Sequence, residues 1–172
     1  WQPDEDLFIE YFNQHPEVKL VIAPHVIDEN HLVEIIRKLK RPYVRYTRAD
    51  EKNVRKADCL IIDCFGLLSS IYRYGEIAYI GGGFGVGIHN TLEAAVYGIP
   101  VIFGPKYQKF QEAIQLLEAK GAFSVKDYEE LKTLIDRMLT DEVFLRESGM
   151  NASNYVTGNA GATDKIMSMI NF

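Results

Sequence analysis

A run of glycines between two short apolar segments constrains this chain more than any other feature. Five glycines fall within residues 81–87. Glycine tolerates a positive φ and lets a ligand lie against the backbone. The run follows a predicted strand at residues 77–80 and precedes a helix that Asn90 or Thr91 can cap. The free N–H groups and the positive end of the dipole at that helix N-terminus predict a phosphate site.

The helix after the glycine run carries one acidic side chain close to its start. Glu93 lies one turn in, where its carboxylate would reach sugar hydroxyls beside a bound phosphate. Gly98 ends the helix and Pro100 prevents its continuation. A further apolar strand is predicted at residues 101–103. The stretch therefore has the order strand, glycine turn, helix, strand.

Short apolar strands alternate with amphipathic helices along the rest of the chain. Strands are predicted at 18–23, 43–46, 58–63, 77–80, 101–103 and 122–125. Helices are predicted at 3–14, 28–41, 66–74, 90–98, 108–120, 127–139 and 141–155, with a last short helix carrying Ile166, Met169 and Ile170 and an exposed loop at 47–57. This alternation predicts an α/β fold: a Rossmann-like parallel sheet with helices on both faces.

Parallel sheets of this kind bind ligands beyond the carboxyl ends of their strands. The turns after Ala23, Asp63, Ile80 and Phe103 should therefore open on the same edge. We expect the candidate site to lie where these turns converge.

Composition limits the classes of function. The chain has 172 residues, enough for one domain with a full core. Its net charge of −5 and its lack of a basic run argue against a nucleic-acid surface. No sequence cluster has the spacing of metal ligands, so neither a metal nor a cofactor is predicted. The first residue is Trp1 and not Met, and we expect the chain to be a piece of a longer protein.

Two common phosphate-binding motifs do not fit the glycine run. A dinucleotide fingerprint follows the first strand of its fold, whereas this run follows the fourth predicted strand. A Walker loop requires Gly-Lys-Ser or Gly-Lys-Thr after the glycines, and neither occurs here.

The segment GGGFGVGIHNTLEAAVYGIPVIFGPKYQKFQEA resembles the carboxy-terminal half of the Kdo (3-deoxy-D-manno-octulosonic acid) transferases. That family carries the pattern GGxF…GGHN-x-LEP-A-…-G-x-PV-x-x-GP, and Ile88 stands here in place of the second glycine of GGHN. The resemblance is specific over about residues 63–113. It implies the GT-B fold, in which two Rossmann-like domains enclose the active site. Residues 1–172 would then be a single nucleotide-sugar donor-binding domain, a fragment lacking the N-terminal acceptor domain.

The resemblance assigns roles to residues of the glycine run. Gly83, Phe84 and Gly85 match the turn that approaches the donor. His89 and Asn90 match the His-Asn pair at the start of the helix.

Three other segments are assigned in the same way. Glu93 matches a glutamate that binds ribose hydroxyls in GT-B enzymes. Phe65 and Gly66 match a turn that flanks the nucleobase. Pro24 matches the proline of a turn after the first strand, and His25 stands where many members have arginine.

The function that the resemblance implies is inverting transfer of Kdo from CMP-Kdo to a lipid A precursor in lipopolysaccharide biosynthesis. The general base of the family lies in the N-terminal domain, so no catalytic residue is expected in this fragment. The isolated domain should bind nucleotide weakly and transfer nothing. The full-length protein should associate peripherally with the cytoplasmic face of the bacterial inner membrane.

Two other interpretations stay open. One is a different GT-B glycosyltransferase that uses a UDP-sugar, and base preference would separate it from a Kdo transferase. The other is a non-catalytic nucleotide-binding α/β domain of flavodoxin-like type. That class predicts an acidic or phosphate-receiving cluster at the end of the first strand, where this chain has Pro24 and His25.

Overall fold

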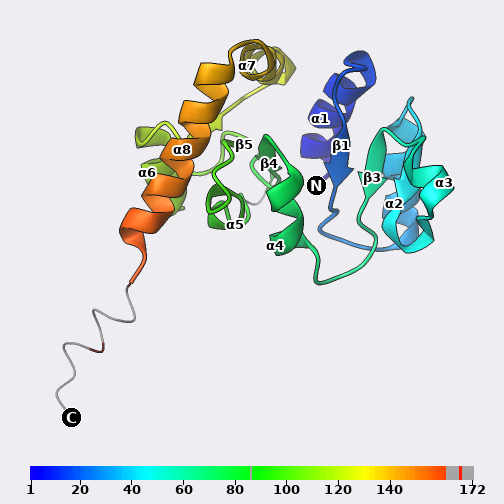
Figure 1. The fold of residues 1–172 in the computed structure, drawn as a ribbon, viewed down its shortest axis with the longest axis horizontal. Helices are drawn as coiled ribbons and strands as arrows, with labels where there is room; N and C mark the ends of the chain where they lie inside the picture. The colour runs from blue at the N-terminus through cyan, green and yellow to red at the C-terminus, as the bar shows by residue number, and fades with distance from the viewer. Residues whose placement is uncertain (86, 162–166, 168–172) are drawn as a thin grey trace.

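The computed structural model describes residues 1–85, 87–161 and 167 (Figure 1). Strands and helices alternate, as the sequence predicts. The strands are β1 (Leu20–Ile22), β2 (Tyr43–Arg45), β3 (Cys59–Ile61), β4 (Ala78–Ile80), β5 (Val101–Phe103) and β6 (Ala122–Ser124). The α-helices are α1 (Gln2–Gln14), α2 (Glu29–Lys38), α3 (Glu51–Val54), α4 (Leu68–Ile71), α5 (Leu92–Ala95), α6 (Gln111–Glu118), α7 (Tyr128–Thr140) and α8 (Glu142–Asn159).

All the strand pairs are parallel, which confirms the predicted α/β class. They form two three-stranded sheets, with strand orders β1-β3-β2 and β4-β5-β6. In the central strands, Leu60 of β3 is in register with Val21 and Val44, and Ile102 of β5 with Tyr79 and Phe123. No ladder joins β1 to β4 in the described part of the chain, so the strands form two sheets rather than one.

Helix α1 packs against both halves of the molecule (Figure 1). Its residues Ile9 and Phe12 lie in a buried cluster with β1, β3 and α2. Its residue Phe8 also contacts Tyr79 of β4, with ring centroids 5.6 Å apart. Burial of these large apolar side chains fixes α1 across the two sheets, since each contributes roughly 1.5–3 kcal/mol.

The helix boundaries follow local capping. Asp28 caps α2, accepting the N–H groups of Asn30 (2.9 Å) and His31 (3.1 Å). At the start of α7, Asp127 and Glu130 form only half of a capping box. Asp127 accepts the Glu130 N–H, but the Glu130 carboxylate accepts from the N–H of Lys126 instead of Asp127.

Sequence expectations about two helical segments need correction. Residues 47–57 are not a plain loop, because they contain part of a 3-10 turn (Tyr46–Arg48) and α3. Helix α3 begins at a capping box formed by Asp50 and Asn53. Helix α8 continues through Gly158 instead of ending at residue 155. The helix expected around Ile166, Met169 and Ile170 lies outside the described residues.

Candidate functional site

The glycine turn between β4 and α5 is organised around Gly82. The Gly82 carbonyl accepts the N–H groups of Gly85 (2.9 Å) and Gly87 (3.1 Å). Gly82 has φ +95°, and a Cβ there would lie 2.2 Å from the Gly87 carbonyl oxygen. Its own N–H donates to Asp4 of α1 at 3.1 Å. Every polar main-chain atom of Gly82 therefore has a partner, which makes it the centre of the turn.

The next residues hold the turn against the end of β5. A Cβ on Gly83 would lie 2.5 Å from the main-chain nitrogen of Gly104, so only glycine allows this approach. The Gly83 carbonyl accepts the Lys106 N–H at 2.9 Å, and the Lys106 ammonium donates to the Gly85 carbonyl at 3.1 Å. Phe84 is partly buried beside Gly104. The predicted residues Gly83, Phe84 and Gly85 thus lie beyond the carboxyl ends of β4 and β5.

An aromatic stack joins the turn after β1 to the end of the glycine turn. The rings of His25 and His89 lie 4.5 Å apart and 29° from parallel. The Trp1 ring stacks on both, and its indole N–H donates to Nε2 of His89 at 2.8 Å. Burial, with a smaller effect of His25, lowers the pKa of His89 and favours the neutral ring that can accept this bond. Pro24 is buried just before this stack.

Asn90, just before the N-cap residue Thr91, bonds both to the first residue of α5 and to Glu93. The Asn90 carbonyl oxygen accepts the Leu92 N–H (3.0 Å), and its amide donates to the Glu93 carboxylate (3.1 Å). Thr91 makes no capping bond, and its hydroxyl is buried without a partner among the described residues. Helix α5 has four residues and is shorter than predicted, so its dipole is correspondingly small.

The turn after β3 carries an exposed aromatic side chain and is preceded by a buried carboxylate. Phe65 is 85% exposed, and Gly66 has φ +87° with open space around it. Just before them, the Asp63 carboxylate is buried and accepts from the Thr47 N–H (2.8 Å), the Thr47 hydroxyl (2.6 Å) and Nε of Arg45 (2.8 Å). Burial alone would raise the pKa of Asp63, but these hydrogen bonds lower it to about 2. Asp63 therefore stabilises the turn as a carboxylate.

Sequence reasoning missed Asp4 and Trp1. Asp4 is completely buried, and its carboxylate accepts the Tyr79 hydroxyl (3.0 Å) as well as the Gly82 N–H. An acidic residue in the first turn of a helix is ordinarily explained by the helix dipole. Nothing local in the sequence therefore connects it to a turn 78 positions away.

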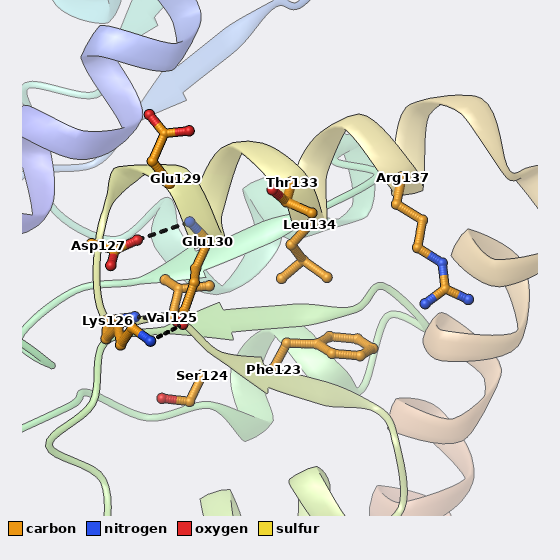
Figure 2. A pocket seen from close by; sticks show the side chains of 10 residues that line it. All are labelled: Phe123, Ser124, Val125, Lys126, Asp127, Glu129, Glu130, Thr133, Leu134 and Arg137. Carbon is orange, nitrogen blue, oxygen red and sulfur yellow. Dashed lines mark hydrogen bonds and ion pairs between the residues drawn. The ribbon is translucent and has the colours of Figure 1, made fainter.

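A separate pocket of about 590 Å³ lies between β6 and α7 (Figure 2). None of the predicted site residues lines it. Four of its charged side chains already stabilise α7 and its surroundings: Asp127 caps the helix, Lys126 pairs with Glu130, and Arg137 covers the ring of Phe144. We therefore place the candidate site at the glycine turn.

Within the described ranges, no three His, Cys, Asp or Glu side chains come together in a way that would hold a metal ion. In that same part of the chain, every helix is too short or too polar to cross a lipid bilayer.

Comparison with known proteins identifies relatives of this chain. A 3-deoxy-D-manno-octulosonic acid transferase of Aquifex aeolicus (strain VF5) is 35% identical over 135 residues, which are 77% of this chain and 37% of that protein. Over these residues, the chain is a homologue of the Kdo transferases. A bifunctional glycosyltransferase/methyltransferase of Fusobacterium nucleatum is 27% identical over 164 residues, covering 89% of this chain and 26% of the relative. No family model matches the chain.

The chain therefore spans well under half the length of these relatives.

A solved structure adds information about the fold. The crystal structure of the C-terminal CMP-Kdo binding domain of WaaA from Acinetobacter baumannii superimposes with a TM-score of 0.76 at 19% identity. The match covers 90% of this chain and 83% of that one, and it confirms the predicted Rossmann-like fold.

Proposed function

We propose that this chain is the donor-binding domain of a glycosyltransferase that transfers Kdo from CMP-Kdo to a lipid A precursor in lipopolysaccharide biosynthesis. The observation that carries the proposal is the 35% identity to a Kdo transferase over 135 residues. The site geometry supports it, because the motif residues lie beyond the carboxyl ends of parallel strands.

In this proposal, the donor lies across the turns after β1 and β3 and the turns after β4 and β5. Glu93, oriented by the amide of Asn90, accepts hydrogen bonds from the ribose hydroxyls. The exposed ring of Phe65 stacks on the cytosine. The phosphate lies near the glycine turn and the His25–His89 pair. Fixed dipoles of the turn would then meet the charge that develops on the departing CMP, which is electrostatic catalysis.

The remaining parts of the reaction belong to residues outside this chain. The general base that activates the acceptor hydroxyl for inverting transfer would come from an N-terminal acceptor domain, which would also bind the lipid A precursor. That domain would bring the protein to the cytoplasmic face of the inner membrane as a peripheral protein. The isolated chain would bind the nucleotide and transfer no sugar.

Calorimetric titration with CMP, UMP and UDP tests the donor assignment. We expect CMP to bind in preference to both uridine nucleotides. Glu93→Ala should weaken CMP binding about tenfold, equivalent to about 1.4 kcal/mol for a lost charge-assisted hydrogen bond. Glu147→Ala is the matched control, because Glu147 is exposed on α8 and should leave CMP affinity unchanged.

Two results would contradict the proposal. Preference for UDP would favour a glycosyltransferase that uses a UDP-sugar. Absence of binding by all three nucleotides would argue against a donor site in this chain.

A further inference from the structure

We propose that Asp4 is a positioning residue of the donor site, which holds the glycine turn in its binding conformation through the Gly82 N–H. Asp4 belongs to α1 and stands outside every motif of the site. The part of this inference that concerns ligand binding rests on the proposed function. The part that concerns the turn does not.

The Asp4 side chain has no contact with solvent and two partners. One carboxylate oxygen accepts the Tyr79 hydroxyl at 3.0 Å, and the other accepts the Gly82 N–H at 3.1 Å. Both distances are those of good hydrogen bonds. Burial, together with the nearby Asp4 carboxylate, raises the pKa of Tyr79, so its hydroxyl remains a donor. Asp4 therefore links α1 both to β4 and to the turn that follows it.

The bond to Gly82 has an effect beyond one residue. The Gly82 carbonyl accepts two N–H groups of the same turn, and the adjacent Gly83 lies against Gly104. A rotation of the peptide before Gly82 would disturb the bonds on both sides of it. Gly83, Phe84 and Gly85 follow immediately, so the main-chain conformation of Gly82 sets the orientation of their N–H groups.

The first turn of α1 is also connected to the turn after β1. Glu5, next to Asp4, is buried and accepts a hydrogen bond from Nε2 of His31 at 2.9 Å. Nδ1 of His31 lies 2.9 Å from the Val26 carbonyl, in the turn after β1. The first turn of α1 is thus linked to the glycine turn directly, through Asp4, and to the turn after β1 through His31.

The role of Asp4 requires acceptor geometry and not negative charge. In Asp4→Asn, the amide oxygen can still accept the Gly82 N–H, and the amide nitrogen can donate to the Tyr79 hydroxyl, which accepts as well as donates. In Asp4→Ala both partners remain buried without an acceptor. The asparagine variant should therefore rescue what the alanine variant loses.

The test combines amide hydrogen exchange with CMP titration of the 172-residue chain. We expect the Gly82 amide to be protected in the wild-type protein and in Asp4→Asn, and to exchange at least tenfold faster in Asp4→Ala. CMP affinity should fall about tenfold in Asp4→Ala and stay within about twofold of wild type in Asp4→Asn. Asp6→Ala is the matched control, because Asp6 is on the same helix and pairs with Lys38.

Tyr79→Phe separates positioning from general stability. It removes one partner of Asp4 but leaves the Gly82 bond, so CMP affinity and Gly82 protection should both persist even if the protein is less stable. The inference is overturned if Tyr79→Phe weakens CMP binding as much as Asp4→Ala does. An unprotected Gly82 amide in the wild-type protein would also overturn it, whether or not any variant folds. If wild type binds no CMP, the proposed function fails, and the exchange measurements alone decide the role of Asp4.

Discussion

The two halves of the candidate site are built by different means. The turns after β4 and β5 pack against each other through their main chains, because Gly82 bonds within its own turn and Gly83 touches Gly104. The turn after β3 depends on charged side chains, because Asp63 binds Arg45 and Thr47. The first half should therefore be sensitive to any added side-chain atom. The second half should be sensitive to the ionisation of Asp63.

The largest effect should come from Gly83→Ala. Its Cβ would lie within 2.5–2.9 Å of three backbone atoms of Gly104, which no side-chain rotation can relieve. We expect a loss of about 3 kcal/mol or more in the free energy of unfolding, measured in urea. Gly158→Ala is the control, since it lies in α8 with open space around it and should change stability by less than about 1 kcal/mol. A tolerated Gly83→Ala would show that the turn is not packed by its main chain.

A smaller and pH-dependent effect should follow from Asp63→Asn. The pKa of Asp63 is lowered from 3.8 to about 2 in the folded protein, so its ionised form contributes about 2 kcal/mol. This contribution is fully present above pH 3.8 and is lost as pH falls toward 2. Urea unfolding should show wild type more stable than Asp63→Asn by about 2 kcal/mol at pH 7, with the difference shrinking below pH 4.

The control for that series is Asp50→Asn. Asp50 is the exposed N-cap of α3, where asparagine caps as well as aspartate, so stability should change by less than about 0.5 kcal/mol at pH 7. A difference between wild type and Asp63→Asn that stays constant from pH 7 to pH 2 would rule out the ionic role of Asp63.

The smallest effect on stability should come from Phe65→Ala. With its side chain 85% exposed, we expect the free energy of unfolding to change by less than about 0.5 kcal/mol. CMP affinity should nevertheless fall about tenfold, because stacking on a base is worth about 1–3 kcal/mol. Tyr74→Ala, which truncates another exposed aromatic side chain, should change neither quantity. Unchanged CMP affinity in Phe65→Ala would remove the turn after β3 from the donor site.

The fold was predictable because local patterns are strong in this chain. Short apolar strands alternate with helices, and Asp28 marks the start of α2 as expected. The division into two sheets was not predictable, because strand pairing depends on contacts between distant segments. The short helix after Asp50 was missed because four residues are too few to show a helical period.

The candidate site was predictable to the extent that its residues lie in one segment. The close packing of Gly83 and the capping bond of Asn90 are what their residue types suggest. The roles of Asp4 and Trp1 were hidden, because both act on turns far along the chain. Ile88 stands where the pattern of the Kdo transferases has glycine. Its burial is explained by its place in the core beside β4 and β5.

The position of α1 has a consequence for how the protein folds. Its Asp4 and the Gly82 that it binds are separated by 78 residues, and its Tyr11 donates a hydrogen bond to Asp136 across 125 residues. Contacts of such high sequence separation form slowly, because closing a long loop precedes the energy gained from the contact. Helix α1 must therefore wait for segments of the chain that are made after it, and the glycine turn reaches its final form only when that helix docks.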